Sequence, residues 1–179
     1  HNLKKNKSAS FISKASKIFG YLDGLTKKNT NEILDKIKEK KIQQVFINGS
    51  NLGKLAKAIK QRFPSVQIIS FFHNVETKFF FDSFKRALTI KSFFILVSNY
   101  LTEFKAVKYS DVVICLSDRD SNALFALFKR KADHLAPMVM EDQVSYLDLE
   151  EIPDNNFALF VGGAFFANIS GITWFINNV

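Results

Sequence analysis

The chain has 179 residues, 47% of them hydrophobic, and carries a formal net charge of +8. This length suits one domain of ordinary size, or one domain with part of another, and the apolar content excludes wholesale disorder. The longest uncharged stretch in the phenylalanine-rich middle, residues 92–102, is shorter than the roughly 20 residues of a membrane-spanning helix. No signal-peptide pattern follows the basic opening, so we expect a cytoplasmic protein.

The net positive charge is compatible with nucleic acid, an anionic membrane face or a phosphorylated substrate as partner, or simply with solvated lysines. No nucleic-acid signature of aromatic, zinc-spacing or basic-heptad type is present, so we expect no nucleic-acid partner. The single cysteine, Cys115, lies inside an apolar run. This placement is typical of a small buried hydrophobic residue rather than a nucleophile or a disulfide partner.

Apolar runs and helical periods alternate along the chain. A first helix face is formed by Phe11, Ile12, Ala15, Ile18, Phe19 and Leu22. Thr30 is predicted to cap a second helix, and Ser50 or Asn51 a third that Pro64 stops. One or two phenylalanine-rich helices are expected within residues 77–110. Ser117 and Asp120 are spaced as a capping box for a further helix with Leu124, Phe125 and Phe128 on its inner face.

Strands are predicted near residues 45–49, 66–73, 111–117 and 133–139. Their near-continuous apolar character is typical of a parallel sheet. Alternation of strand and helix predicts an α/β fold, a Rossmann-like parallel sheet with helices on both faces. In such sheets ligands bind outside the carboxyl ends of the strands, and the polar run His73, Asn74 and Glu76 follows one of these ends.

Residues 140–156 are acidic and lack a helical face, which indicates a linker after a domain of residues 1–139. A strand ending in Gly162 and Gly163 and a helix with Ile169, Ile172, Ile176 and Val179 then begin a second α/β unit, residues 157–179. One strand and one helix cannot bury a core. We therefore expect the chain to be part of a longer protein.

Several familiar sites do not fit. Gly49 and Gly53 are one residue too close for a phosphate-binding P-loop, and no dinucleotide fingerprint is present. Metal ligation by His73 and Glu76 lacks a third ligand with suitable spacing, so no metal site is predicted. A triad of Ser117, His73 and Asp118 lacks the sharp turn that exposes a nucleophilic serine. The alternatives for these residues are a buried imidazole, helix caps and, for Gly162 and Gly163, a tight turn.

Three stretches, "FFHNVETKFF", "ICLSDRDSNALFALFKRKADHLAPMVMED" and "ALFVGGAFFANISGITWFINNV", together resemble bacterial family-four glycosyltransferases of GT-B fold that build capsular or exopolysaccharide. The resemblance runs from about Val45 to the last residue. It implies two Rossmann-like domains, of which the N-terminal one holds the acceptor and the C-terminal one a nucleotide-sugar. It also implies retaining transfer without a catalytic metal or other cofactor, the nucleotide-sugar being a co-substrate. The family's first strand and its pair of glutamates eight positions apart have no counterpart here.

The resemblance also implies roles for individual residues. The histidine matching His73 faces the cleft and contacts the donor sugar or leaving group. Asn74 and Glu76, and at the neighbouring strand end Ser117, Asp118 and Arg119, are then candidates for substrate binding. Gly162, Gly163 and Asn168 are candidates for binding the donor diphosphate, because glycines at a strand end and a helix N-terminus expose backbone N–H groups.

The phenylalanine-rich segment mixes aromatic and cationic side chains, as interfacial helices do. Since acceptors in such pathways are often lipid-linked, a membrane surface is a candidate partner, and burial of the aromatic side chains in the core is the alternative. The residues concerned are Phe79, Phe80, Phe84, Arg86, Lys91, Phe93 and Phe94. Two other functions remain open: a non-catalytic α/β module for a phosphorylated ligand, and a basic protein that binds membrane or nucleic acid through its lysines.

Overall fold

The computed structural model describes residues 22, 24–86, 88–139, 158–164 and 166–179. The predicted first helix and the acidic linker lie outside these residues, apart from Leu22. The chain divides into two compact units, with the boundary between Val139 and Met140.

The first unit is built on a parallel sheet of four strands in the order β1-β2-β3-β4. The strands are β1 (Gln44–Asn48), β2 (Gln67–Phe72), β3 (Val112–Cys115) and β4 (His134–Leu135). The predicted parallel α/β fold is therefore confirmed. The last strand is much shorter than the predicted 133–139, because only His134 and Leu135 pair with β3.

The described residues of the first unit form six helices. They are α2 (Lys27–Glu39), the 3-10 helix η1 (Ser50–Leu52), α3 (Gly53–Arg62), α4 (Glu76–Arg86), α5 (Ile90–Tyr109) and α6 (Asp118–Phe128). The predicted phenylalanine-rich helical segment is confirmed, and it forms two helices, α4 and α5. The cap of α2 is Thr26 rather than Thr30, since Thr26 and Asn29 bond each other's backbone reciprocally. No side-chain cap starts α3, because η1 precedes it and Leu52 occupies the cap position.

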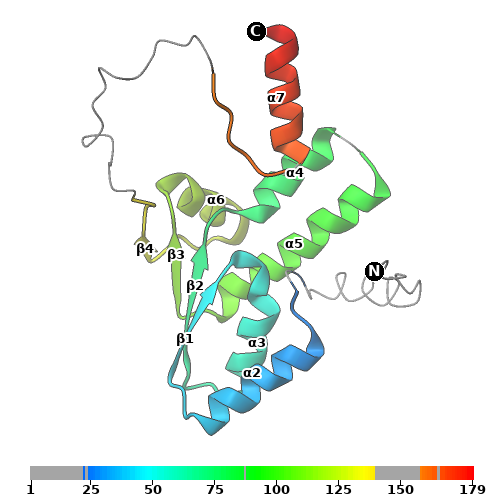
Figure 1. The fold of residues 1–179 in the computed structure, drawn as a ribbon. Helices are drawn as coiled ribbons and strands as arrows, with labels where there is room; N and C mark the ends of the chain where they lie inside the picture. The colour runs from blue at the N-terminus through cyan, green and yellow to red at the C-terminus, as the bar shows by residue number, and fades with distance from the viewer. Residues whose placement is uncertain (1–21, 23, 87, 140–157, 165) are drawn as a thin grey trace, which may run out of the picture. The chain divides into compact units, whose positions relative to one another are not determined.

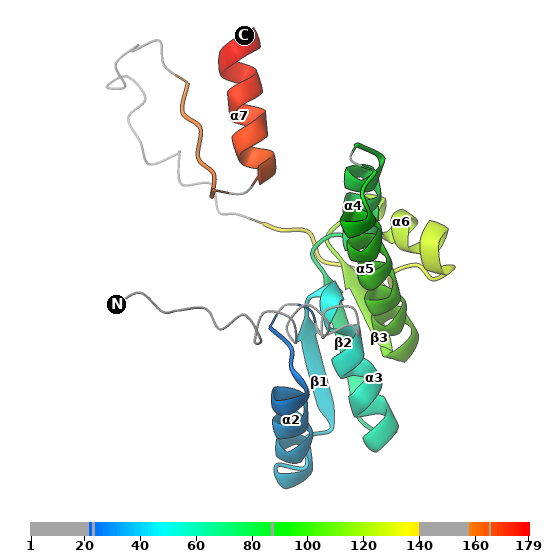
Figure 2. The same cartoon turned by 90° about the vertical axis from the view of Figure 1, so that its right-hand side faces the viewer.

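All the described helices that build the core pack on one face of the sheet (Figures 1 and 2). Towards β1, side chains of α2 and α3 bury Ile47 and Ile68. Towards β3, side chains of α5 and α6 bury Phe72, Val113 and Cys115. Phe125 points away from this core and is 48% exposed, so its predicted place on the inner face of α6 is wrong.

The opposite face of the sheet carries no described helix. Its side chains, which we call the open face, are Phe46, Ile69, Phe71, Val112 and Ile114, as the strand alternation and register define them. On the open face, Phe46 is 57% exposed and the other four residues are half-buried. On the covered face, Ile47, Ile68, Phe72, Val113 and Cys115 are buried. The prediction of helices on both faces is therefore confirmed for one face; for the other it stays a prediction, because the predicted first helix lies outside the described residues. A continuous apolar strand does not reveal how many of its faces are covered.

In the second unit, residues 158–163 do not form the predicted strand. Strand-forming residues need a neighbouring strand for their backbone hydrogen bonds, and none pairs with them among the described residues. The predicted helix is present as α7 (Phe166–Asn178), and Ile169, Trp174 and Ile176 on it are exposed.

None of the described helices combines the length and hydropathy needed to cross a membrane.

Candidate functional site at the carboxyl edge of the sheet

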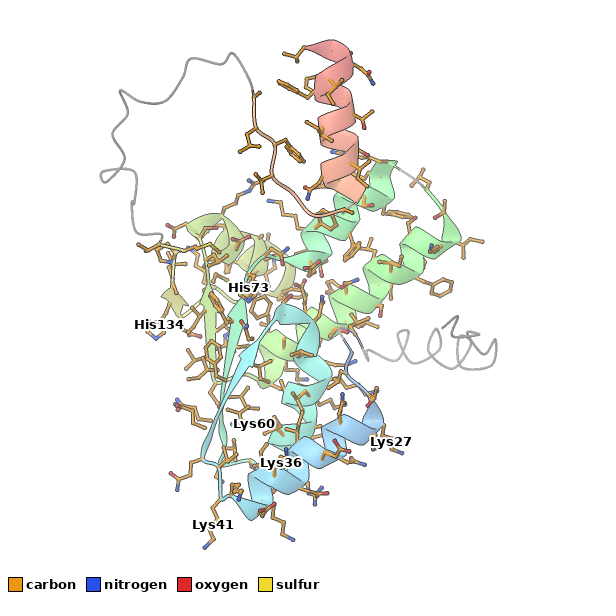
Figure 3. All side chains as sticks on the ribbon, in the orientation of Figure 1. Lys27, Lys36, Lys41, Lys60, His73 and His134 are labelled. Carbon is orange, nitrogen blue, oxygen red and sulfur yellow. The ribbon has the colours of Figure 1, made fainter. Side chains whose placement is uncertain are left out.

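His73 directly follows β2 and is exposed, so it is not a buried core imidazole. Its Nε2 lies 2.6 Å from Oδ1 of Asn48, the last residue of the neighbouring strand β1. Because an amide oxygen only accepts, Nε2 is the donor, which leaves Nδ1 of the neutral ring as an acceptor for a ligand. The ring also packs edge-on against Phe71, with centroids 4.6 Å apart, and is thus held on the open face. Figure 3 labels His73 near the end of β2.

Asn48 was not among the predicted site residues. The register places it beside Phe71, and strand alternation brings it to the same face of the sheet as His73. The signal for it in the sequence is a polar residue at the carboxyl end of a strand next to the strand that carries His73. Its hydrogen bond holds the imidazole in one orientation, so Asn48 positions the His73 side chain.

Asn74 is exposed, and Glu76 begins α4. The main chain at this point is fixed by Glu103, a fully buried residue of α5. Glu103 Oε1 accepts the N–H of Glu76 at 2.8 Å, and Oε2 accepts the N–H of Thr77 at 2.9 Å. Burial raises the pKa of Glu103, although hydrogen bonds from Thr77, Ser50 and the Glu76 amide act in the opposite direction.

Ser117 caps α6, as predicted: its Oγ accepts the Asp120 N–H at 3.3 Å and donates to Asp120 Oδ2 at 2.5 Å. Asp118 and Arg119 are exposed in the first turn of the same helix. The acidic residues Asp118 and Asp120 occupy the turn where an anion would otherwise bind, so this helix start suits hydroxyl groups better than phosphates. Since Glu103 already takes the first amides of α4, neither helix start presents a vacant phosphate site.

The structure therefore brings the predicted residues of this unit to one edge of one sheet but divides them between its faces. His73 lies on the open face with Asn48, whereas Glu76 is tied to Glu103 on the helix-covered side. Arg119 lines a groove between α4, α5 and α6 whose lining includes neither His73 nor Ser117. A single cleft shared by these residues stays a prediction.

In the second unit, Asn168 Nδ2 donates to the Gly163 carbonyl at 3.1 Å. A side chain at Gly162 would meet the Phe160 ring at 3.0 Å and the Asn168 amide at 3.1 Å. These contacts give Gly162 a local steric reason to be glycine. Binding of a diphosphate here stays a prediction.

The part of the chain that the structure describes contains no group of three or more His, Cys, Asp or Glu side chains suited to a metal ion. Cys115 is fully buried, and burial together with Asp120 and Glu103 raises the pKa of its thiol to about 12. It therefore stays a protonated, unreactive thiol at neutral pH.

Comparison with protein-family models and with curated proteins found no match.

Proposed function

We propose that the residues at the carboxyl edge of the sheet form the acceptor-binding side of a glycosyltransferase. The enzyme would move a sugar from a nucleotide-sugar to a glycan or lipid-linked acceptor in bacterial surface polysaccharide synthesis. The observation that carries the proposal is the His73–Asn48 pair, an exposed and oriented imidazole at the carboxyl edge of a parallel sheet. The resemblance of three stretches of the sequence to family-four glycosyltransferases supports it further.

The chemistry of glycosyl transfer suits this pair. Departure of a nucleoside diphosphate develops negative charge, and oriented dipoles and cations stabilise that charge only where they are already in place. With Nε2 bonded to Asn48, the Nδ1 edge of His73 accepts from a sugar hydroxyl when neutral and donates to an anionic oxygen when protonated. We assign His73 to the donor sugar or leaving group, and not to a general base.

The other residues at the carboxyl edge of the sheet would bind the acceptor. Asp118 and the Glu76 side chain offer carboxylates to sugar hydroxyls, Asn74 offers an amide, and Arg119 offers a cation. The starts of α4 and α6 are occupied by acids, which supports placing the donor diphosphate elsewhere, at Gly162, Gly163 and Asn168. We propose a retaining reaction without metal, as in the family that the chain resembles.

A place at the inner face of the cytoplasmic membrane is part of the proposal. The connection between α4 and α5 carries large apolar side chains in water: Leu88 is 76% and Ile90 79% exposed. Phe93 and Phe94 are also exposed, whereas Phe79, Phe80 and Phe84 are half-buried. Lys85, Arg86 and Lys91 flank this tip and would meet anionic headgroups.

The direct test is an assay for nucleoside diphosphate release over a panel of nucleotide-sugars, with and without a chelator. The protein should carry these residues together with a complete donor-binding domain, and the 179-residue chain should be assayed beside it. We expect acceptor-dependent release by the former in the presence of chelator, and none by the latter. Binding of a phosphorylated ligand without release under any condition would favour a non-catalytic module instead.

A further inference from the structure

Four lysines lie together where α3 packs on α5, a group that we call the lysine cluster: Lys54, Lys57, Lys105 and Lys108. The two helices are side by side (Figures 1 and 2), and they approach so closely that a Cβ on Gly53 would lie 1.9 Å from the Thr102 carbonyl oxygen. The ammonium of Lys57 lies 6.0 Å and that of Lys108 5.8 Å from the centroid of the Tyr109 ring. One aromatic ring therefore contacts a cation from each helix.

The two helices that carry the lysine cluster contribute no acid to it. α3 contains neither aspartate nor glutamate. Glu103, the one acid of α5, is fully buried and accepts the N–H groups of Glu76 and Thr77 at the start of α4. A group of cations without acids between them raises the local concentration of anions by about tenfold or more. The lysine cluster is therefore suited to a small anion of high charge.

Lys105 combines a nucleophile with this positive charge. Its side chain is half-buried, as are those of Lys54 and Lys57. Burial lowers the pKa of the Lys105 amine, and the nearby charges of Lys54 and Lys57 lower it further. A larger share of this amine is therefore neutral at neutral pH, and only the neutral amine has the lone pair that attacks a carbonyl carbon.

We propose that the lysine cluster binds an acyl phosphate, a small molecule that carries an acyl group on a phosphate dianion, and that Lys105 is acylated by it. Lys54 and Lys57 hold the phosphate through charge-assisted hydrogen bonds. The neutral amine of Lys105 attacks the acyl carbon, so that the amide C–N bond forms and the C–O bond to the phosphate breaks. The phosphate leaves with the electron pair of that bond and takes up the proton that the amine loses. The products are acyl-Lys105 and inorganic phosphate.

The probe is acetyl phosphate, incubated with the full 179-residue chain, and mass spectrometry of its peptides gives the acetylation rate at each lysine. Lys105 should be acetylated at least about tenfold faster than Lys131, an exposed lysine outside the cluster, because the cluster concentrates the donor beside the amine. Excess inorganic phosphate should slow acetylation of Lys105 and leave that of Lys131 unchanged. Equal rates at Lys105 and Lys131, or no competition by phosphate, would overturn the proposal.

A neutral acetyl donor separates anion binding from the reactivity of the amine. N-hydroxysuccinimidyl acetate carries no phosphate, so its preference for Lys105 over Lys131 should be at least about threefold smaller than that of acetyl phosphate. If the two donors show the same preference, the cluster does not bind the phosphate and the proposal fails.

Substitutions on α3 test the two cations that hold the phosphate. Lys54→Gln/Lys57→Gln should slow acetylation of Lys105 by acetyl phosphate at least about tenfold. Lys54→Arg/Lys57→Arg keeps both charges and should retain most of the rate. The matched control, Lys36→Gln/Lys38→Gln, removes two exposed lysines from α2 and should react like the wild type. An undiminished rate at Lys105 in the α3 glutamine variant, with helical circular dichroism intact, would overturn the proposal.

Discussion

Nε2 of His73 and Oδ1 of Asn48 lie 2.6 Å apart, although 25 residues separate them in the sequence. The contact exists because β1 and β2 are parallel neighbours, which brings their carboxyl ends to one edge. It gives an exposed imidazole a fixed orientation in the absence of ligand. Pre-orientation of this kind matters for catalysis, because a group that is already in place loses no further freedom as the transition state forms.

If Asn48 acts through His73, the effects of removing the two residues should not add. In the transfer assay, Asn48→Ala should lower kcat by about tenfold with little change in KM, since it loosens the ring but leaves it present. The double variant Asn48→Ala/His73→Ala should be no slower than His73→Ala alone. If the loss of kcat in the double variant equals the product of the two single losses, Asn48 contributes independently of His73.

Glu103 should make stability pH-dependent in an unusual direction. Its pKa is raised in the folded state above the ordinary 4.5, so the folded chain binds a proton more tightly than the unfolded chain. Stability from this group is therefore full below about pH 4.5 and is lost as the pH rises through the folded-state pKa. Denaturant titrations should show wild type losing stability relative to Glu103→Gln as pH rises over this window.

The control for this titration is Glu32→Gln on the exposed side of α2, which should show no such trend. Asp111 and Asp133 do not interfere within that window, because their contributions to stability change only at lower pH. Burial opposes ionisation of both, but hydrogen bonds and nearby cations, Lys60 and Arg130 for Asp111 and Arg130 for Asp133, lower the pKa of each below its ordinary 3.8. Their stabilisation is present above pH 4 and is lost only at lower pH. If the unfolding free energy of the wild type rises relative to that of Glu103→Gln as the pH increases, the prediction is refuted.

Gly53 is required by packing and not by phosphate binding. A Cβ at this position would lie 1.9 Å from the Thr102 carbonyl oxygen and 2.4 Å from the Ala106 nitrogen, both main-chain atoms of α5. Gly53→Ala should therefore force α3 from α5 and lower the free energy of unfolding by at least about 2 kcal/mol. Gly171→Ala, where nothing lies within 4 Å, should be neutral or stabilising. Equal melting temperatures of Gly53→Ala and Gly171→Ala would contradict the close approach of α3 to α5.

Arg130 closes the carboxyl end of α5. Its guanidinium donates to the carbonyls of Val107 and Ser110, both at 2.7 Å, and to Asp133 Oδ2 at 2.8 Å. Arg130→Ala removes the guanidinium from both carbonyls, while Asp133 keeps the Val113 N–H as its donor, and it should cost about 3 kcal/mol of unfolding free energy, measured by denaturant titration. Arg130→Lys should recover only part, since an ammonium cannot span the same acceptors. Full recovery by lysine would show that charge alone matters.

The elements that could be predicted from the sequence are those whose signal is local. Val112 to Cys115 is an apolar run between helical periods, and Ser117 precedes a helix with Asp120 at the capping position. The cap of α2 is a case where the local signal fails: Thr30 is the predicted cap, but Thr26 caps the helix through its reciprocal bond with Asn29.

Contacts between distant residues could not be predicted. In the sequence, Glu103 is one acidic residue on a long helix. Its two hydrogen bonds form only when α4 packs against α5 and brings in N–H groups from 26 and 27 residues away. The open face is a further case, because Phe46 and Phe71 are as apolar as the buried Ile47 and Phe72 that alternate with them. Coverage of a face depends on tertiary packing, which strand periodicity does not encode.

The central claim is that His73 participates in sugar transfer, and its most direct test is turnover in the protein that pairs these residues with a complete donor-binding domain. His73→Ala should lower kcat at least about a hundredfold with KM nearly unchanged, because a contact to the leaving group strengthens as the bond breaks. His134→Ala, which removes an exposed histidine from β4, is the matched control and should retain wild-type turnover. Wild-type turnover in the His73→Ala variant would contradict the account.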